Sequence, residues 1–382
     1  MKTSSALVQS FIARETFNGY ARTQLMKLAP AAGLESDTQK MVRVLEDMIE
    51  PWGNWEIKET PHWFSDVCAD GSPIEFSIAL DGQEPEVRVL VEALAEEATL
   101  EAHQRSARVL TERLAREYGA SIDRVKQLED LFLPENPQGG WAMMHAVMFR
   151  RGEAPDFKVY LNPEAQGVEK APEIMREAFR RLGFEKAWAS VEKFASRGFE
   201  HDRLVYLSLD LADHEQARIK VYFRHYEATA AELDQAMSIA RGHATGLAEA
   251  FSRDVSGHTG AFSSQPLVTC LSFTKCDDER PANATLYVPL WTCSANDAVT
   301  RLRIRSSLLS RGLPVAAYDS ALQTMARRPL EDGNGIHTYA AFRTQNGRPR
   351  ITSYWSAELY ERNPAPRYQR TTPASRLHLV QP

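Results

Sequence analysis

The feature that most constrains the fold of this 382-residue chain is a unit that recurs five times along it. Each unit has two short β-strand patterns joined by a turn, and in all but the last a helical stretch follows. The strand pairs are predicted near residues 74–94, 141–163, 204–225, 266–291 and 337–355. Equivalent positions in the second strands, spaced 70, 62, 67 and 67 residues apart, are Arg88, Lys158, Lys220, Tyr287 and Tyr354. Repeats of this length indicate one closed architecture rather than five separate domains.

Ten antiparallel strands with helices on one side can close into a barrel, which leaves no strand edge exposed. We therefore predict an α+β fold with a ten-stranded antiparallel β-barrel inside an outer ring of α-helices. One domain is expected to span 1–382. A barrel of ten strands is too wide for side chains alone to fill, so its lumen should hold solvent or a ligand.

Alternation along the strands predicts what lines that lumen. In the segment RIKVYFRH, residues 218–225, the apolar residues at positions 219, 221 and 223 share one face, because side chains two apart point the same way. The other face carries Arg218, Lys220 and Tyr222. Lys158 with Tyr160 and Thr285 with Tyr287 follow the same pattern. A polar face turned to water is the simpler reading of one strand, but five strands in the same register favour a shared interior.

Cations that face one lumen repel each other and lose hydration, so an anion should accompany them. Arg88, Lys158, Arg218 and Lys220 suit a diphosphate, to which they would donate charge-assisted hydrogen bonds. The sequence has no Walker A loop, no GxGxxG after a strand and no DDxxD motif. The acidic run 276–279 is more typical of a solvated turn. We therefore expect protein cations, rather than a metal, to neutralise the diphosphate.

Aromatic residues supply the second half of the pattern. Tyr160, Tyr222, Tyr287 and Tyr354 would form a ring of electron-rich faces in the lumen, each stabilising a nearby cation by roughly 0.5–2 kcal/mol. Aromatic rings beside a diphosphate site indicate a ligand that loses diphosphate and leaves an allylic carbocation, which the rings shield from water. The alternative is that these rings simply fill the barrel core.

In these motifs the sequence resembles the dimethylallyltryptophan synthase type of aromatic prenyltransferase, which has the ABBA barrel fold (also called the PT barrel), from about residue 50 to 360. The motifs that carry the resemblance are IEFS with Glu75, the arginine of EVRV, the K-x-Y of FKVY, the R-x-K-x-Y of RIKVY and the strand LYVPL. The resemblance implies a prenyl-diphosphate site made of Arg88, Lys158, Tyr160, Arg218, Lys220, Tyr222, Thr285, Tyr287, Arg350 and Tyr354. The family often has a glutamine where this chain has Thr285. Arg350 is included because it shares a strand face with Tyr354.

The resemblance also implies roles for two residues near the acceptor. Glu75, a carboxylate on an otherwise apolar strand, would accept a hydrogen bond from an indole N–H and orient the ring; a salt bridge to Arg88 is the alternative. His145 stands where relatives are thought to have a proton-accepting lysine, so it would take the ring proton, unless it is an ordinary core histidine. The predicted acceptor pocket consists of Glu75, Trp141, Tyr206 and Tyr339.

The predicted activity is transfer of a dimethylallyl or geranyl group from a prenyl diphosphate to the indole ring of tryptophan or a tryptophan-derived metabolite. The reaction would be a metal-independent Friedel–Crafts alkylation without a cofactor, in secondary metabolism such as alkaloid biosynthesis. A non-catalytic barrel that binds an anionic lipid or cofactor is the alternative; a phosphoryl-transfer enzyme is disfavoured by the lack of a clustered Asp/His metal set. The small residues Cys270 and Ser272 bear on donor length, which the sequence leaves open together with the acceptor, the regiochemistry and the oligomeric state.

Composition and charge limit the remaining classes. A net charge of -6 argues against a nucleic-acid partner that depends on global positive charge. Without CxxC or zinc-type spacing, a reducing compartment with free thiols is expected for Cys68, Cys270, Cys276 and Cys293. The N-terminal apolar run is too short for a signal peptide and no 18-residue apolar span occurs, so we expect a cytoplasmic protein with no membrane partner.

Overall fold

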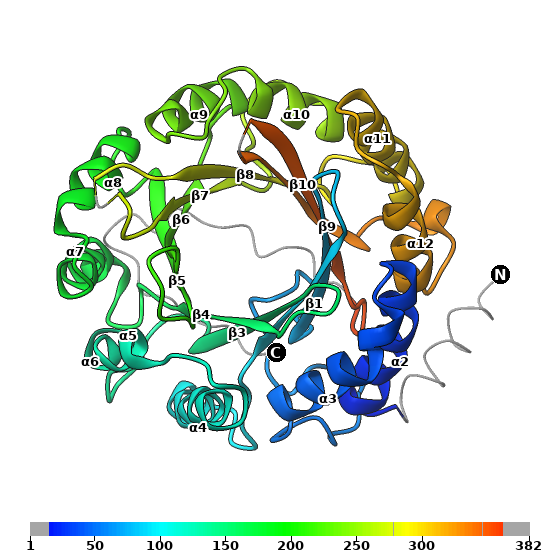
Figure 1. The fold of residues 1–382 in the computed structure, drawn as a ribbon, viewed down its shortest axis with the longest axis horizontal. Helices are drawn as coiled ribbons and strands as arrows, with labels where there is room; N and C mark the ends of the chain where they lie inside the picture. The colour runs from blue at the N-terminus through cyan, green and yellow to red at the C-terminus, as the bar shows by residue number, and fades with distance from the viewer. Residues whose placement is uncertain (1–14, 278, 346, 362–382) are drawn as a thin grey trace.

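In the computed structural model, which describes residues 15–277, 279–345 and 347–361, ten strands close into an antiparallel barrel with the helices outside it (Figure 1). Each strand pairs with its neighbours in sequence and the last pairs with the first, so no edge is left unpaired. The predicted barrel and its five strand pairs are confirmed. The strands are β1 (Ile74–Leu80), β2 (Glu86–Glu92), β3 (Met143–Phe149), β4 (Asp156–Leu161), β5 (Asp202–Asp210), β6 (Ile219–His225), β7 (Leu267–Phe273), β8 (Asn283–Pro289), β9 (His337–Gln345) and β10 (Arg348–Ser356).

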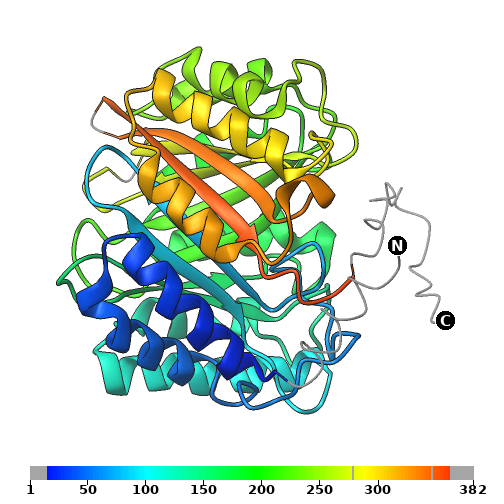
Figure 2. The same cartoon turned by 90° about the vertical axis from the view of Figure 1, so that its right-hand side faces the viewer.

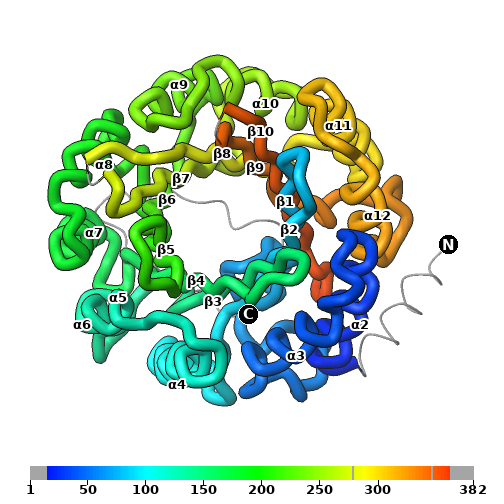
Figure 3. The backbone as a smooth tube through the Cα atoms, in the orientation of Figure 1, coloured from blue at the N-terminus to red at the C-terminus, as the bar shows by residue number. Residues whose placement is uncertain are grey.

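The helices lie along the outer wall of the barrel (Figure 2). They are α2 (Phe17–Ala31), α3 (Thr38–Met48), α4 (Leu100–Tyr118), α5 (Asp123–Lys126), α6 (Glu129–Phe132), α7 (Ala171–Arg181), α8 (Trp188–Phe194), α9 (Ala230–Ala236), α10 (Leu247–Ser256), α11 (Asp297–Ser310) and α12 (Ala316–Met325). The last hairpin has no helix after it, as the sequence indicates. The sequence pattern did not predict that α2 and α3, which precede the first strand, complete the ring beside α12 (Figure 3).

Local signals define α4, the helix that packs against β3. Thr99 caps the start of α4, since its hydroxyl accepts a hydrogen bond from the backbone N–H of Ala102. Gly119 ends the helix with φ of 70°, a left-handed conformation that glycine adopts without strain. Between these caps, Leu110 and Leu114 are buried, and they give α4 the apolar face that packs on the barrel.

The two faces of each strand have opposite roles. The outer faces carry the apolar residues that the alternation predicts to meet the helices, among them Val159, Val221 and Leu286, each fully buried. The helix ring and the barrel wall form one continuous core. Burying one such side chain in it stabilises the fold by roughly 1.5–3 kcal/mol. The polar side chains are left on the inner faces, where they line the lumen.

The two ends of the barrel differ, because neighbouring strands follow one another in the sequence and alternate in direction. Because every pair β1–β2 to β9–β10 is a hairpin, all five hairpin turns lie at one end, which we call the hairpin end. Connections to the helices lie at the opposite end, where residues 64–69 (the strap) border the lumen. Within the described residues, no helix is long and apolar enough to cross a membrane.

Candidate active site

The lumen is layered, and single strands show the order of the layers. From the hairpin end inward, the lumen face of β6 and the residue before it present Arg218, Lys220, Tyr222 and Arg224. The chain along β4 presents an acid at 156, then Lys158, then a tyrosine at 160. A cationic layer therefore lies nearer the hairpin end, and an aromatic layer lies deeper.

The cationic layer contains six side chains. Five of them border a lumen cavity of about 60 Å³: Arg88, Lys158, Lys220, Arg343 and Arg350. Arg218 lies on the hairpin side of this layer and borders a wider mouth of about 1010 Å³. The structure thus brings all five sequence-predicted cations together. Arg343 was missed, although it lies on the same face of β9 as Tyr339, four residues away, and this spacing could have identified it.

Two carboxylates lie within the cationic layer, one buried (Glu86) and one partly buried (Asp210). Glu86 Oε1 lies 3.2 Å from Arg350 and also pairs with Arg88, while its other oxygen accepts from Arg150 over 2.8 Å. Asp210 Oδ2 accepts a 2.6 Å hydrogen bond from Arg218 Nε. The sequence interpretation assigned a role to neither acid, although alternation places both on the lumen face.

The cations still outnumber the acids. The nearby acids raise the pKa values of Arg88 and Arg218, but the pKa values of the two lysines, Arg343 and Arg350 are lowered. Burial and the nearby Lys220 and Arg218 hold the pKa of Lys158 well below its ordinary range. Burial and Arg218 lower the pKa of Lys220 to about 8, and burial with Arg350 lowers that of Arg343 to about 10. Such an arrangement favours a multiply charged anion, which would restore these pKa values and satisfy the donors.

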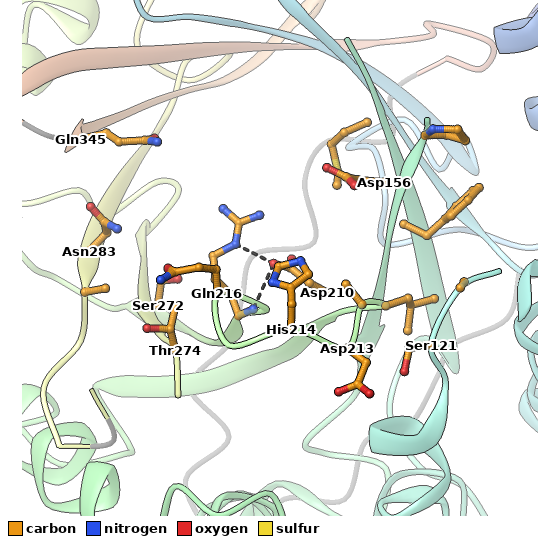
Figure 4. Close-up of a pocket in the computed structure, with 18 of the residues that line it drawn as sticks. Ser121, Asp156, Asp210, Asp213, His214, Gln216, Ser272, Thr274, Asn283 and Gln345 are labelled. Atoms are coloured by element: carbon orange, nitrogen blue, oxygen red, sulfur yellow. Dashed lines mark hydrogen bonds and ion pairs between the residues drawn. The ribbon is translucent and has the colours of Figure 1, made fainter. Parts of the chain in front are cut away.

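The mouth at the hairpin end leads to this layer. Figure 4 shows Asp210 near its centre, with dashed lines to the guanidinium group and the backbone nitrogen of Arg218. Ser272, Thr274 and Asn283 lie on one side and Asp156 on the other. Polar side chains therefore surround the approach to the cations.

The tyrosine layer lies next to the cations. Adjacent members of the set Tyr160, Tyr222, Tyr287 and Tyr354 have ring centroids 5.9 Å apart in each of the three successive pairs. Burial raises the pKa of all four hydroxyl groups, so the rings are neutral. Thr285 borders the same part of the lumen. An arc of neutral rings beside an anion site can stabilise a cation and keep water from it.

Beyond the tyrosines, a cavity of about 210 Å³ opens toward the opposite end. Glu75 borders it, is 7% exposed, and accepts a 2.9 Å hydrogen bond from Thr338 Oγ1. Burial raises the pKa of Glu75 to about 8. Among the described residues Glu75 forms no salt bridge with Arg88, which pairs with Glu86 instead. One oxygen of a buried acid is thus available to a hydrogen-bond donor in the cavity.

The other predicted pocket residues lie around this cavity. Tyr206 and Tyr339 line it, and their hydroxyl groups bond to Asp66 over 2.8 Å and to Gln265 over 3.3 Å. Trp141 packs on Tyr206, with centroids 5.2 Å apart, but is not among the residues that line the cavity. The strap completes the lining and was missed, because it belongs to no repeat and has no periodic pattern.

His145 does not lie in the lumen, so its assignment as proton acceptor is corrected. On β3 the lumen face carries Met144, Ala146 and Met148, and His145 points the other way, toward α4. Its Nε2 lies 2.8 Å from Thr111 Oγ1, it is fully buried, and burial lowers its pKa to about 3. The cause of the error is a one-residue shift in counting along the strand, which moves a side chain to the other face.

Metal coordination has no evident place in the described part of the chain. In it, no group of three or more His, Cys, Asp or Glu side chains is arranged to hold a metal ion. That catalysis needs no metal stays a prediction.

A ten-stranded barrel with helices outside, and with cations and tyrosines layered in its lumen, defines the ABBA class of prenyltransferases. The family model described as tryptophan dimethylallyltransferase matches residues 34–319. The chain therefore belongs to the tryptophan dimethylallyltransferase family, and it is a prenyltransferase enzyme. Family membership decides against the non-catalytic carrier.

Solved structures give the same result. The 6-dimethylallyltryptophan synthase from Micromonospora olivasterospora, in complex with DMASPP and Trp, is 34% identical with a TM-score of 0.86, over 92% of this chain and 99% of that one. The prenyltransferase PriB, in a ternary complex with L-tryptophan and dimethylallyl thiolodiphosphate, is 33% identical with a TM-score of 0.85, over 92% and 99%. The 5-dimethylallyltryptophan synthase from Streptomyces coelicolor is 32% identical with a TM-score of 0.84, over 91% and 99%.

Proposed function

We propose that this enzyme transfers a dimethylallyl or geranyl group from the corresponding diphosphate to an indole ring carbon of tryptophan or a tryptophan-derived metabolite. The observation that carries the proposal is the order of the layers: cations, then tyrosines, then a cavity with Glu75. Relatives solved with a thiolodiphosphate and L-tryptophan, or with DMASPP and Trp, support the same pair of substrates.

The donor step follows from the cationic layer. Lys158, Lys220 and Arg218 hold the diphosphate and stabilise the negative charge that develops on it as the C–O bond breaks. The allylic cation that remains lies against the tyrosine layer, where the ring faces stabilise it and exclude water. Because protein cations surround the leaving group, we propose that turnover requires neither a metal nor another cofactor.

The acceptor step follows from the cavity beyond. Glu75 accepts a hydrogen bond from the indole N–H, which fixes the ring beside the cation and raises its electron density. A ring carbon attacks the allylic cation, forming the C–C bond, and the proton on that carbon leaves to a water molecule. This is a Friedel–Crafts alkylation, and its expected setting is secondary metabolism such as alkaloid biosynthesis.

Donor length depends on the space beside the tyrosines. Cys270 faces the lumen opposite Tyr222 on the paired strand, so a small side chain lies where a longer prenyl tail would extend. Ser272 lies opposite Lys220 and borders the mouth instead. We therefore propose that Cys270, rather than Ser272, leaves room for a geranyl donor.

The test is incubation of the protein with dimethylallyl or geranyl diphosphate and a panel of indoles, in the presence of EDTA. We expect prenylated indole and free diphosphate, identified by mass spectrometry, with each donor. Binding of the donor without release of diphosphate would contradict the proposal. If EDTA abolishes turnover and added metal restores it, the proposed metal independence is wrong, but the proposed transfer reaction stands.

A further inference from the structure

Each acid of the cationic layer holds two of the predicted diphosphate-binding cations. Asp210 Oδ2 accepts from both the side chain and the backbone N–H of Arg218, over 2.6 and 3.1 Å, and its Oδ1 lies 3.8 Å from Lys158 Nζ. Glu86 contacts Arg88 and Arg350 in the same way from β2. The two acids thus divide four of the six cations between them.

Burial makes these contacts consequential. Glu86 is 5% exposed, and the side chain of Asp210 is 12% exposed. A buried cation without a counter-ion either loses its proton or moves toward water. Arginine keeps its proton under nearly all conditions, but lysine gives it up readily when it is desolvated. The acid beside a lysine therefore has a different task from the acid beside arginines.

We propose that Asp210 and Glu86 are positioning residues for the diphosphate: Asp210 keeps Lys158 charged and Arg218 oriented before the diphosphate binds, and Glu86 orients Arg88 and Arg350. The inference rests on the proposed function, since it assumes that these cations bind the diphosphate. Neither acid touches the reacting atoms, so both act through their partners.

The charges around the two lysines support this division. The charged and titratable groups that face Lys158 and Lys220 are Arg88 and Glu86 from β2, Asp210 from β5, Arg218 before β6, Cys270 from β7 and Arg343 from β9. Three of these groups, the arginines, are cationic and each lowers the pKa of at least one lysine, whereas Asp210 raises the pKa of both lysines. Removing its charge should therefore cause the lysines to lose their protons at a lower pH.

The experiment measures binding of inorganic pyrophosphate to the intact protein by calorimetry at pH 6.5 and pH 8.5. In Asp210→Asn we expect affinity at pH 8.5 to fall by about tenfold relative to wild type, with a much smaller change at pH 6.5. Asp210→Glu, which keeps the charge, should restore most of the affinity at pH 8.5. In Glu86→Gln the loss should be similar at both pH values, because Glu86 forms its ion pairs with arginines and lies farther from the lysines.

The matched control is Asp213→Asn, which removes one negative charge from the same mouth but from an exposed side chain of the β5–β6 turn. It should leave affinity unchanged at both pH values. Circular dichroism and thermal melts establish that each variant is folded. If Asp210→Asn does not fold, Asp210→Glu and Glu86→Gln still test the inference, since pH-dependent loss in Glu86→Gln would contradict it.

The inference and the proposed function fail in different ways. If folded wild-type protein does not bind pyrophosphate, the diphosphate site itself is wrong. If wild type binds and Asp210→Asn binds as tightly or more tightly at pH 8.5, the positioning role is overturned and the diphosphate site stands.

Discussion

The hydroxyl of Thr338 donates a 2.9 Å hydrogen bond to Oε2 of Glu75, two strands away across the barrel wall. Burial raises the pKa of Glu75 to about 8, and this hydrogen bond lowers it. Below that pH the free enzyme holds Glu75 mainly as the neutral acid. Ionisation as the pH rises makes it a stronger acceptor for an indole N–H.

The first prediction concerns the pH dependence of the acceptor step. At saturating prenyl diphosphate, kcat/KM for the indole should rise as the pH passes through about 8, because Glu75 gains its charge there. Glu75→Gln should remove this rise and lower kcat/KM by about tenfold or more, the usual cost of a lost hydrogen bond to a charged group. Thr338→Val should move the rise to higher pH, because the bond that lowers the pKa of Glu75 is gone. A wild-type profile in Glu75→Gln would refute the orienting role.

The second prediction concerns donor binding. Lys220→Met keeps most of the apolar stem but removes the charge, so KM for the prenyl diphosphate should rise by about 10- to 100-fold, with little change in KM for the indole. Steady-state kinetics with each substrate varied in turn provide the measurement. Lys193→Met, on the exposed face of α8, is the control and should behave as wild type. A rise in KM for the indole alone would contradict the assignment of Lys220 to the diphosphate site.

The third prediction concerns protection of the allylic cation. Tyr287 lies between Tyr222 and Tyr354 in the ring, and Tyr287→Leu removes one aromatic face. We expect the ratio of prenyl alcohol to prenylated indole to increase by about 5- to 30-fold, since one face is worth roughly 1–2 kcal/mol to a desolvated cation. Tyr287→Phe retains the face and should keep the ratio near that of wild type. Equal ratios in the Leu and Phe variants would contradict shielding by this ring.

The fourth prediction follows from the outward orientation of His145. His145→Leu should keep kcat within about twofold of wild type, because the side chain does not reach the lumen. Its effect on the free energy of unfolding should be about 1 kcal/mol or less, since the Thr111 hydroxyl still donates to the carbonyl of Ala107 over 2.9 Å. Turnover and urea unfolding measure the two quantities. Loss of activity in a stably folded variant would return His145 to the mechanism.

The strand pattern predicts much of the fold because period-two alternation is local. The predicted strand pair near 74–94, for example, contains β1 and β2 as the structure has them. Closure of the barrel follows from the number of repeats and from the cost of open edges. The position of α2 and α3 could not be predicted in this way, because α2 packs against α12, which is far from it in the sequence, and α3 packs against α2.

In the candidate site, too, local features could be predicted from the sequence and long-range contacts could not. Alternation places Lys158 and Tyr160 on the lumen face, and the structure has both there. Counting along β3 failed by one residue for His145, since one position reverses the direction of a side chain. The acids Glu86 and Asp210 could have been assigned to the lumen, but their partners depend on which strands meet across the barrel.

Residue type and period are properties of each single strand, so they were enough to predict the kind of chemistry: cations for an anion and tyrosines for a cation. The depth of each side chain and its partners became evident in the folded barrel alone, since both arise from the stagger of closed strands and from burial. Those two properties give Lys220 its pKa of about 8, pair Asp210 with Arg218, and place Glu75 beside a cavity rich in aromatic side chains.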